Sequence, residues 1–276
     1  MIRVRHTSHS SARFLPLVTI MALILCGCQG TRVEAMQTLN KLPSLEQALK
    51  MSGSRYSGEK PSHQSDVTFK VKQNYDLIFA RREQLEISNE VKGYFEKAVT
   101  QAEKKFEEGE GDVSQSTVTK LKLGLAGTLN DISQFNSAIA LAQLYLEKRL
   151  GVQWAKQVDI SDPKFQPVEF PHQTSEEFLK NNTLGKVLEE SNLYSLKEAI
   201  IEVNKAREQL ALARKNRKMT RALLVTEAAN YDFGIGNEAD LFEALIIYSR
   251  VLVGYYEAMH SFNVAVYRVY SRPHAK

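Results

Sequence analysis

The sequence predicts an all-α protein made of two tandem, long, antiparallel coiled-coil hairpins. Patterns of apolar residues with helical spacing fill most of the chain. Two Gly-x-Gly stretches interrupt these patterns, at Phe106–Asp112 and Tyr231–Asn237. Paired glycines allow the left-handed backbone that ends a helix and reverses the chain. A shift of 125 residues relates the two stretches, from Gly109 to Gly234, and this indicates an internal repeat.

Residues 1–27 are expected to be a lipoprotein signal peptide and not part of the fold. Three arginines precede an apolar run from Phe14 to Leu25, which is too short to span a bilayer comfortably. A Leu-Cys-Gly-Cys sequence follows, and its small residue just before Cys28 resembles the bacterial lipoprotein signal. The resemblance implies lipidation at Cys28, and Gln29 in place of Asp favours the outer membrane. The alternative is an ordinary secretory signal with an incidental cysteine.

Composition restricts the classes of function. The full chain has a net charge of +4, but three arginines belong to the leader, so the mature chain is near +1. This charge gives no indication of nucleic-acid binding. Both cysteines lie in the Leu-Cys-Gly-Cys sequence, so the mature chain has no internal disulfide and depends on packing. The six histidines are scattered without metal-ligand spacing, and no nucleophile-elbow pattern occurs. We therefore expect no metal, no cofactor and no enzyme activity.

After the leader, the chain divides into four expected segments. Three prolines between positions 163 and 171 exclude a single helix in the middle of the chain, where we expect an irregular connector. A short helical pattern at 44–50 is followed by a polar stretch at 52–65 that is expected to be a loop. The expected order is a tether with a short helix (28–65), a first helical hairpin (66–151), the connector (152–183) and a second helical hairpin (184–271).

The return helix of each hairpin carries an apolar seam. The seam residues alternate in steps of three and four from Val118 to Leu146 and from Leu241 to Val269. This is the a/d pattern of a coiled coil, which one partner helix can cover. The second seam is rich in aromatic residues and therefore needs more than one partner. Four helices from one chain could close as a bundle, or form an arc that other chains close.

Two further motifs support the internal duplication. The Arg-Glu-Gln-Leu sequence of Arg82–Leu85 recurs at Arg207–Leu210 with the shift of 125 that relates the turns. The Phe-Asn-x-Ala sequence of Phe135–Ala138 recurs at Phe262–Ala265 with a shift of 127. The second copy therefore has two extra residues just after its turn.

Two charged runs each allow two interpretations. Four acidic residues around the first turn could bind a cation or a basic patch of an adaptor, or form a solvated tip; they are Glu107, Glu108, Glu110 and Asp112. Six basic residues follow one helix and could form a solvated face or pack against acidic residues of another subunit. These six are Arg207, Arg214, Lys215, Arg217, Lys218 and Arg221.

Taken together, these features resemble the outer-membrane efflux protein family, the TolC-like channels. In that family each half begins with a Ser-Leu-Glu-Glu-Ala-Leu-like segment, matched here at 44–50 and more weakly at 174–180. A long helix, a Gly-containing turn and a return helix then follow. The resemblance implies a homotrimer, or an assembly with another outer-membrane component, in which the lower helices form a periplasmic tube. It covers three ranges, 44–51, 70–151 and 174–271.

The resemblance also implies where partners bind. In the family, the hairpin tips meet a periplasmic adaptor or an inner-membrane transporter. The contact residues implied here are Gly109, Gly111 and Asp112 in the first turn, and Gly234, Gly236, Asn237 and Asp240 in the second.

The sequence departs from the family at the positions of its membrane-crossing β-hairpins. The stretches between Lys50 and Lys70 and between Lys180 and Lys197 are too short for such strands. We therefore expect a TolC-like periplasmic helical domain without a clear β-barrel. The predicted function is a lipid-anchored efflux or export component of the outer membrane, facing the periplasm. The alternative is a non-channel structural or adaptor lipoprotein with a closed four-helix bundle.

Overall fold

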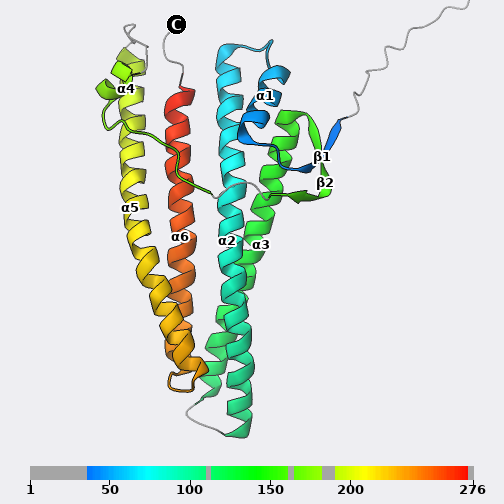
Figure 1. Cartoon of the computed structure of the whole chain (residues 1–276), viewed down its shortest axis with the longest axis vertical. Coiled ribbons are helices and arrows are strands. Elements are labelled where there is room, and N and C mark those ends of the chain that lie inside the picture. Colours follow the sequence, from blue (N-terminus) through cyan, green and yellow to red (C-terminus); the bar gives the residue numbers. More distant parts are fainter. Residues whose placement is uncertain (1–35, 110–112, 161–164, 182–189, 273–276) are drawn as a thin grey trace, which may run out of the picture. The chain divides into compact units, whose positions relative to one another are not determined.

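The computed structural model describes residues 36–109, 113–160, 165–181 and 190–272, most of them in helices. The all-α fold class is therefore confirmed, with a small two-stranded sheet in addition (Figure 1). In chain order the elements are β1 (Gln37–Lys41), α1 (Leu45–Arg55), α2 (Pro61–Glu108), α3 (Gln115–Leu150), β2 (Val152–Asp159), α4 (Ser175–Asn181), α5 (Glu190–Asp232) and α6 (Glu238–Ser271).

The four long helices pack side by side in the order α5, α6, α2, α3. Helix α2 packs along α3, α5 packs along α6, and α2 also packs along α6. Figure 1 shows α6 between α5 and α2. Among the described helices, α2 and α6 are thus inner helices, whereas α3 and α5 are outer ones. None of the described helices combines the length and apolar composition that a membrane crossing requires.

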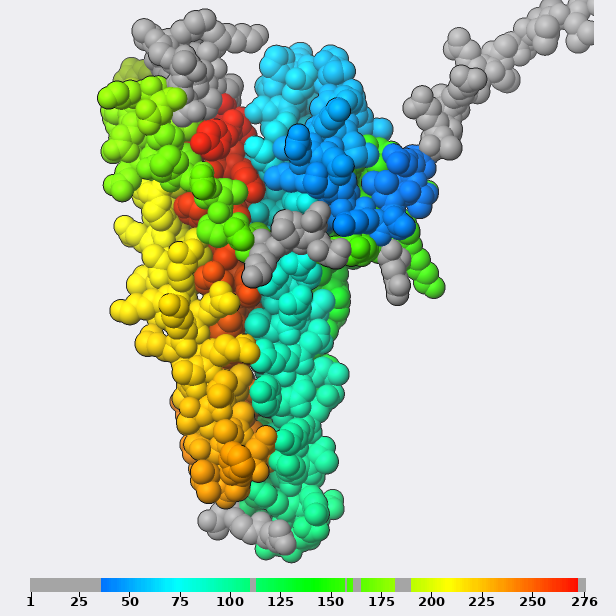
Figure 2. Space-filling model, in the orientation of Figure 1, coloured from blue at the N-terminus to red at the C-terminus, as the bar shows by residue number. Residues whose placement is uncertain are grey.

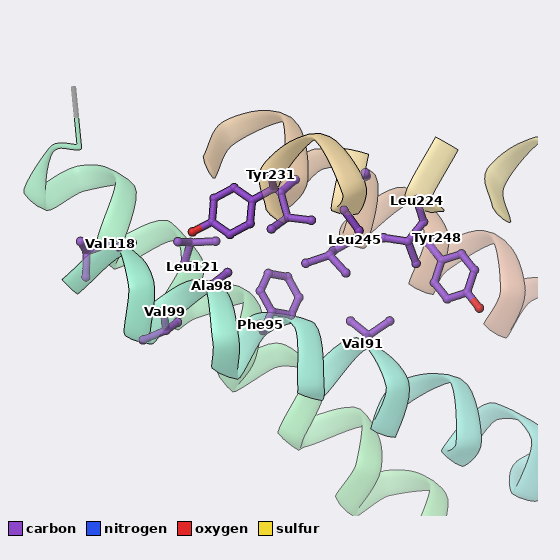
Figure 3. Packing of buried hydrophobic residues seen from close by; sticks show 14 of the residues in the cluster. Val91, Phe95, Ala98, Val99, Val118, Leu121, Leu224, Tyr231, Leu245 and Tyr248 are labelled. Atoms are coloured by element: carbon purple, nitrogen blue, oxygen red, sulfur yellow. The ribbon is translucent and has the colours of Figure 1, made fainter. Parts of the chain in front are cut away.

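The apolar core consists of three clusters. In the cluster nearest the interhelical turns, all four long helices contribute; Phe95, Leu121, Leu224 and Leu245 are members (Figure 3). Farther from the turns the core separates into two. One cluster joins α5 to α6 and to α4, and the other joins α2 to α3, α1 and the sheet. The four long helices therefore share one core only in the half nearest the turns.

The N-terminal segment differs from the predicted tether and loop. Residues Gln37–Lys41 form β1, which pairs in parallel with β2, and Leu42 behind it is only 1% exposed. Helix α1 continues to Arg55, and α2 begins at Pro61, inside the predicted loop. Proline suits the first turn of a helix because it lacks an N–H that would have no partner there. Much of the segment expected to be loose is therefore packed on α2 and α3.

The connector is also more regular than predicted at its start. Residues Val152–Asp159 form β2 because they precede the first proline and can extend without interruption. Trp154 anchors this strand to α3, since its Nε1–H donates to the carbonyl of Gln143 at 2.8 Å. Farther along, Arg207 on α5 donates from Nη2 to the carbonyl of Phe170 at 2.8 Å. Both ends of the connector are thus fixed to long helices.

Candidate docking end at the two interhelical turns

The turn after α2 and the turn between α5 and α6 lie at the same end of the helices (Figure 1). Two ion pairs join α2 to the second turn: Lys97 Nζ lies 2.7 Å from Asp232 Oδ1, and Lys105 Nζ lies 2.8 Å from Glu238 Oε1. Asp232 ends α5 and Glu238 begins α6, so the last turns of α2 contact both sides of the second turn. The two predicted contact regions are therefore neighbours.

In the first turn, Gly109 ends α2 in the left-handed backbone conformation, with φ of 68°. Its N–H donates to the carbonyls of Lys105 and Phe106, which satisfies acceptors at the helix end. Helix α3 then begins after Ser114, whose Oγ accepts from the N–H of Thr117 at 3.2 Å. Gly111 and Asp112 lie outside the described residues, as does the predicted lipidation site Cys28.

In the second turn, both glycines are required for different reasons. Gly234 has φ of 73°, a left-handed conformation that residues with a Cβ adopt only with strain. Gly236 faces crowding, because a Cβ there would lie 3.0 Å from the backbone nitrogen of Tyr231. The N–H groups of Ile235 and Gly236 both donate to the carbonyl of Asn230, at 3.0 and 2.9 Å. The turn is therefore tight and well defined.

Asn237 and Asp240 hold the start of α6. Asn237 Oδ1 accepts from the N–H groups of Ala239 and Asp240, each at 2.9 Å. Its Nδ2 donates to Asp240 Oδ2 at 2.7 Å. These are the bonds of an N-terminal helix cap, which satisfy donors that have no partner within the helix. The structure gives both residues a local role, and their contact with a partner remains a prediction.

Sequence reasoning missed the two apolar side chains of the second turn. Phe233 and Ile235 are 81% and 79% exposed, the highest exposures among the large apolar residues of the described chain. They flank Gly234, and a tight turn at the end of a hairpin leaves them no core to enter. The signal was available, because two large apolar residues alternate with the turn glycines. Such a pair at the end of a rigid element is a candidate contact for another protein.

The polar groups behind the turn form a fixed support. Glu238 is 7% exposed, and its partner Lys105 also lies 5.2 Å from the ring centre of Tyr231. Burial, together with the negative charges of Glu238 and Asp232, raises the pKa of Tyr231 to about 12. Tyr231 therefore stays neutral at ordinary pH. Within the described ranges, no group of three or more His, Cys, Asp or Glu side chains is placed to hold a metal ion.

No protein-family model matches the chain. A search of curated proteins also finds no match.

Several solved structures share the fold. A structure of CusC, a protein described as folding to form a transmembrane channel, is 12% identical with a TM-score of 0.59 over 82% of this chain and 72% of that chain. The outer-membrane channel OprN is 12% identical with a TM-score of 0.59, over 82% and 69%. A membrane protein from Pseudomonas aeruginosa is 9% identical with a TM-score of 0.61, over 82% and 70%. At these identities the likeness shows the fold alone: the chain shares the helical fold of these channel and membrane proteins, in agreement with the fold that the resemblance implied.

Proposed function

We propose that the chain is a lipid-anchored component of an efflux or export system, and that its turn end docks a periplasmic adaptor or an inner-membrane transporter. The observation that carries the proposal is the pair of exposed apolar side chains, Phe233 and Ile235, at the end where both turns meet. Their backbone is held by the tight second turn, so little conformational entropy is lost when a partner covers them. The shared fold with outer-membrane channels supports the same conclusion.

The proposal includes an anchor and an assembly. An acylated Cys28 attaches the N-terminal end of the processed chain to the outer membrane, and the described helices lie in the periplasm. Two acyl chains or more anchor a protein stably, whereas one chain alone binds marginally. Several copies, three by the family resemblance, assemble through the outer helices α3 and α5.

The second candidate is a non-channel structural or adaptor lipoprotein. The core shared by all four long helices near the turns favours it, because a closed bundle needs such a core. The two separate clusters farther from the turns favour an open layer that other chains complete. A strict monomer in detergent would support this second candidate over the assembling component.

The docking proposal is tested by placing charge on the two exposed side chains. The double variant Phe233→Asp with Ile235→Asp should fold normally, since both side chains already lie in water. Chemical cross-linking in cells followed by purification should recover an adaptor or transporter with the wild type and not with the variant. Val225→Asp is the matched control, because Val225 is 59% exposed on α5 but lies away from the turn. Equal recovery with all three proteins would refute docking through this turn.

A second measurement separates the two candidates. Cells that lack the chain should accumulate a fluorescent efflux substrate such as ethidium, and the wild type should reverse this. The double charge variant should fail to reverse it if docking serves transport. Normal efflux without the chain, in cells with no second copy of such a component, would support the structural lipoprotein.

A further inference from the structure

Helix α5 carries a groove of about 680 Å³ that is lined mainly by cations. We call it the basic groove, after its four exposed cations Arg214, Arg217, Lys218 and Arg221. Among the described residues, no carboxylate forms an ion pair with the first three, and Arg221 Nη1 lies 3.8 Å from Glu90 Oε2 on α2. Like charges four residues apart on a helix repel each other, and the groove contains two such pairs. An anionic occupant would therefore relieve a repulsion that the chain itself leaves almost unbalanced.

Two of these cations are held in place by tyrosines of α6. The guanidinium carbon of Arg217 lies 4.9 Å from the ring centre of Tyr255, and that of Arg221 lies 6.0 Å from the ring centre of Tyr248. Arg221 Nη1 also donates to the hydroxyl of Tyr248 at 2.7 Å. A guanidinium that rests on an aromatic ring keeps N–H groups at its edge for an acceptor. The groove is thus partly ordered before a ligand arrives, which lowers the entropy cost of binding.

The corresponding surface of α2 is neutral. The shift of 125 given by the repeated Arg-Glu-Gln-Leu motif relates the four cations to Asn89, Lys92, Gly93 and Glu96. Lys92 Nζ lies 3.2 Å from Glu96 Oε1, one helical turn away, so these two charges balance each other. The excess of positive charge is therefore specific to α5 and does not follow from the duplication.

The connector shows how this face of α5 binds a peptide segment. Residues seven positions apart are about two helical turns apart, so Arg207, Arg214 and Arg221 lie on one face of the helix. Arg207 Nη2 donates to the carbonyls of Phe170 and His172, at 2.8 and 3.0 Å. The connector has neither helix nor strand at these two residues. The face therefore already holds one irregular segment through its backbone carbonyls.

The covered part of this face ends above the basic groove. In Figure 2 the green segment before α4 crosses α6 and reaches the upper part of α5. Asn204 adds a hydrogen bond there, since its Nδ2 donates to the carbonyl of Gln173 at 2.8 Å. Below this segment, no described part of the chain covers α5 on the face that Figure 2 shows. The basic groove is thus the uncovered continuation of a surface that binds peptide.

We propose that the basic groove binds an extended, acidic peptide segment of a partner protein. The segment lies along α5 as the connector lies at Arg207, and its carboxylates neutralise the unpaired cations. Guanidinium groups suit this role because their paired N–H groups match a carboxylate. The cations from Arg214 to Arg221 extend over about 10 Å of helix, which favours an extended chain over a compact anion.

This binding surface is separate from the docking end at the turns. Arg221 and Phe233 are 12 residues apart, which corresponds to about 18 Å of helix. The inference needs neither the lipid anchor nor an assembly of copies. It therefore goes beyond the proposed function and can fail or succeed independently of it.

The test is the binding of a fluorescein-labelled peptide of Glu-Pro repeats to the full-length chain in detergent, measured by fluorescence anisotropy at low salt. Proline keeps this peptide extended, because it prevents helix formation. We expect the wild type to bind the peptide. The double variant Arg214→Glu with Lys218→Glu should bind it at least about tenfold more weakly, because two attractions become repulsions.

A matched control separates the groove from the effect of net charge. Lys120→Glu with Lys215→Glu changes the net charge equally, and both lysines are exposed and do not line the groove. This control should bind the peptide within about twofold of the wild type, since exposed charges outside the groove are largely screened. All four substitutions change exposed side chains, so helix content and thermal midpoint should stay at the values of the wild type.

Three results would overturn the inference. The first is a wild type that does not bind the peptide, or that binds it no better than the Arg214 and Lys218 double variant does. The second is tighter binding of a helical peptide with the same number of glutamates, which would indicate an acidic helix as the partner. The third is equally tight binding of tripolyphosphate, which would indicate a site for small anions.

The docking variant keeps the two proposals distinguishable. Phe233→Asp with Ile235→Asp should bind the Glu-Pro peptide as the wild type does, because neither residue lines the basic groove. Loss of peptide binding in this variant would overturn the assignment of the site to the groove. Loss of adaptor or transporter capture with unchanged peptide binding concerns the turn end alone and supports two separate surfaces.

Discussion

The same Phe-Asn-x-Ala motif occurs in α3 and α6, but its asparagine has opposite surroundings in the two helices. Asn263 on α6 is 0% exposed, and its Nδ2 donates to Asp76 Oδ1 at 2.9 Å. Its Oδ1 accepts from the N–H of Val168 in the connector at 2.8 Å. Asn136 on α3 is exposed, and no hydrogen bond of its side chain is observed in the described part of the chain.

The difference shows that position in the layer, and not the motif, decides the environment. Helix α6 packs between α5 and α2, whereas α3 lies at an edge and has its main contact with α2. The α6 motif therefore fixes three elements to one another: α6, α2 and the connector. The α3 motif has an exposed side. Four predictions sharpen this comparison.

The largest effect is expected from removing the two aromatic side chains of the motif. Phe262 is 5% exposed within a core cluster, so Phe262→Ala should lower the free energy of unfolding by about 3–5 kcal/mol. Phe135 is only half-buried, and Phe135→Ala in the monomer should lower it by less than about 2 kcal/mol. Urea unfolding of both variants measures the difference. Equal losses would show that α3 is as well packed as α6.

The second-largest difference in stability is expected between alanine variants of the two asparagines of the motif. Asn263→Ala leaves the buried carboxylate of Asp76 and the part-buried backbone N–H of Val168 without this partner, and should destabilise the fold by about 2–3 kcal/mol. Asn136→Ala changes a solvated side chain, and its effect in the monomer should stay within about 0.5 kcal/mol. Urea unfolding again gives both values. An effect above 1 kcal/mol at Asn136 would contradict its free position.

A smaller effect is expected at the two turn glycines. Gly109→Ala and Gly234→Ala each place a Cβ in a left-handed conformation and should each reduce stability by about 1 kcal/mol. Gly127→Ala is the control, since Gly127 is helical and a Cβ there would meet nothing within 4 Å. That change should stabilise an isolated chain slightly, because alanine favours helix. Thermal unfolding midpoints of the three variants check this order of stabilities.

The smallest expected effect is the dependence of stability on pH that Asp76 causes. Burial raises the pKa of Asp76 despite hydrogen bonds from His260, Asn263 and Tyr267. The folded state therefore holds more protons than the unfolded state between the ordinary pKa of Asp and the raised value. Stability falls as pH rises through that window, and the destabilising contribution is fully present above the raised pKa.

The variant Asp76→Asn removes this titration. Unfolding midpoints measured from pH 4 to pH 7 should show the wild type gaining stability over the variant as pH decreases. The counterpart of Asp76 on α5 is Ile201, so Ile201→Asn should leave the slope of the wild type unchanged. Parallel profiles for the wild type and Asp76→Asn would contradict the assignment.

The sequence predicted the elements that depend on local pattern and missed those that depend on distant contacts. The long helices and the left-handed Gly109 and Gly234 follow from apolar spacing and from the properties of glycine. The strand at Gln37–Lys41 could not be predicted from local pattern, because a short polar stretch becomes a strand only through its partner Val152–Asp159. The loop predicted at 52–65 is confined to 56–60, since packing on α2 and α3 stabilises α1 up to Arg55 and α2 already begins at Pro61.

The candidate site was predicted in part. The seven predicted contact residues include Gly109, Gly234 and Gly236, which the structure places at one end. Phe233 and Ile235 were not predicted as contact residues, because large apolar residues are normally assigned to the core and the prediction relied on glycine and polar residues. The domain division and the duplication remain predictions from sequence.

The central claim is that the two turns dock a partner, and the most direct measurement is cross-linking in cells from single cysteines at that end. Cysteine should replace Asn237 in one variant and Asp112 in another, with Ser57→Cys in the turn between α1 and α2 as the control. We expect both turn positions, and not position 57, to capture a periplasmic adaptor or an inner-membrane transporter, identified by mass spectrometry. Capture of such a protein from position 57 alone, or of no protein from either turn, would contradict the account.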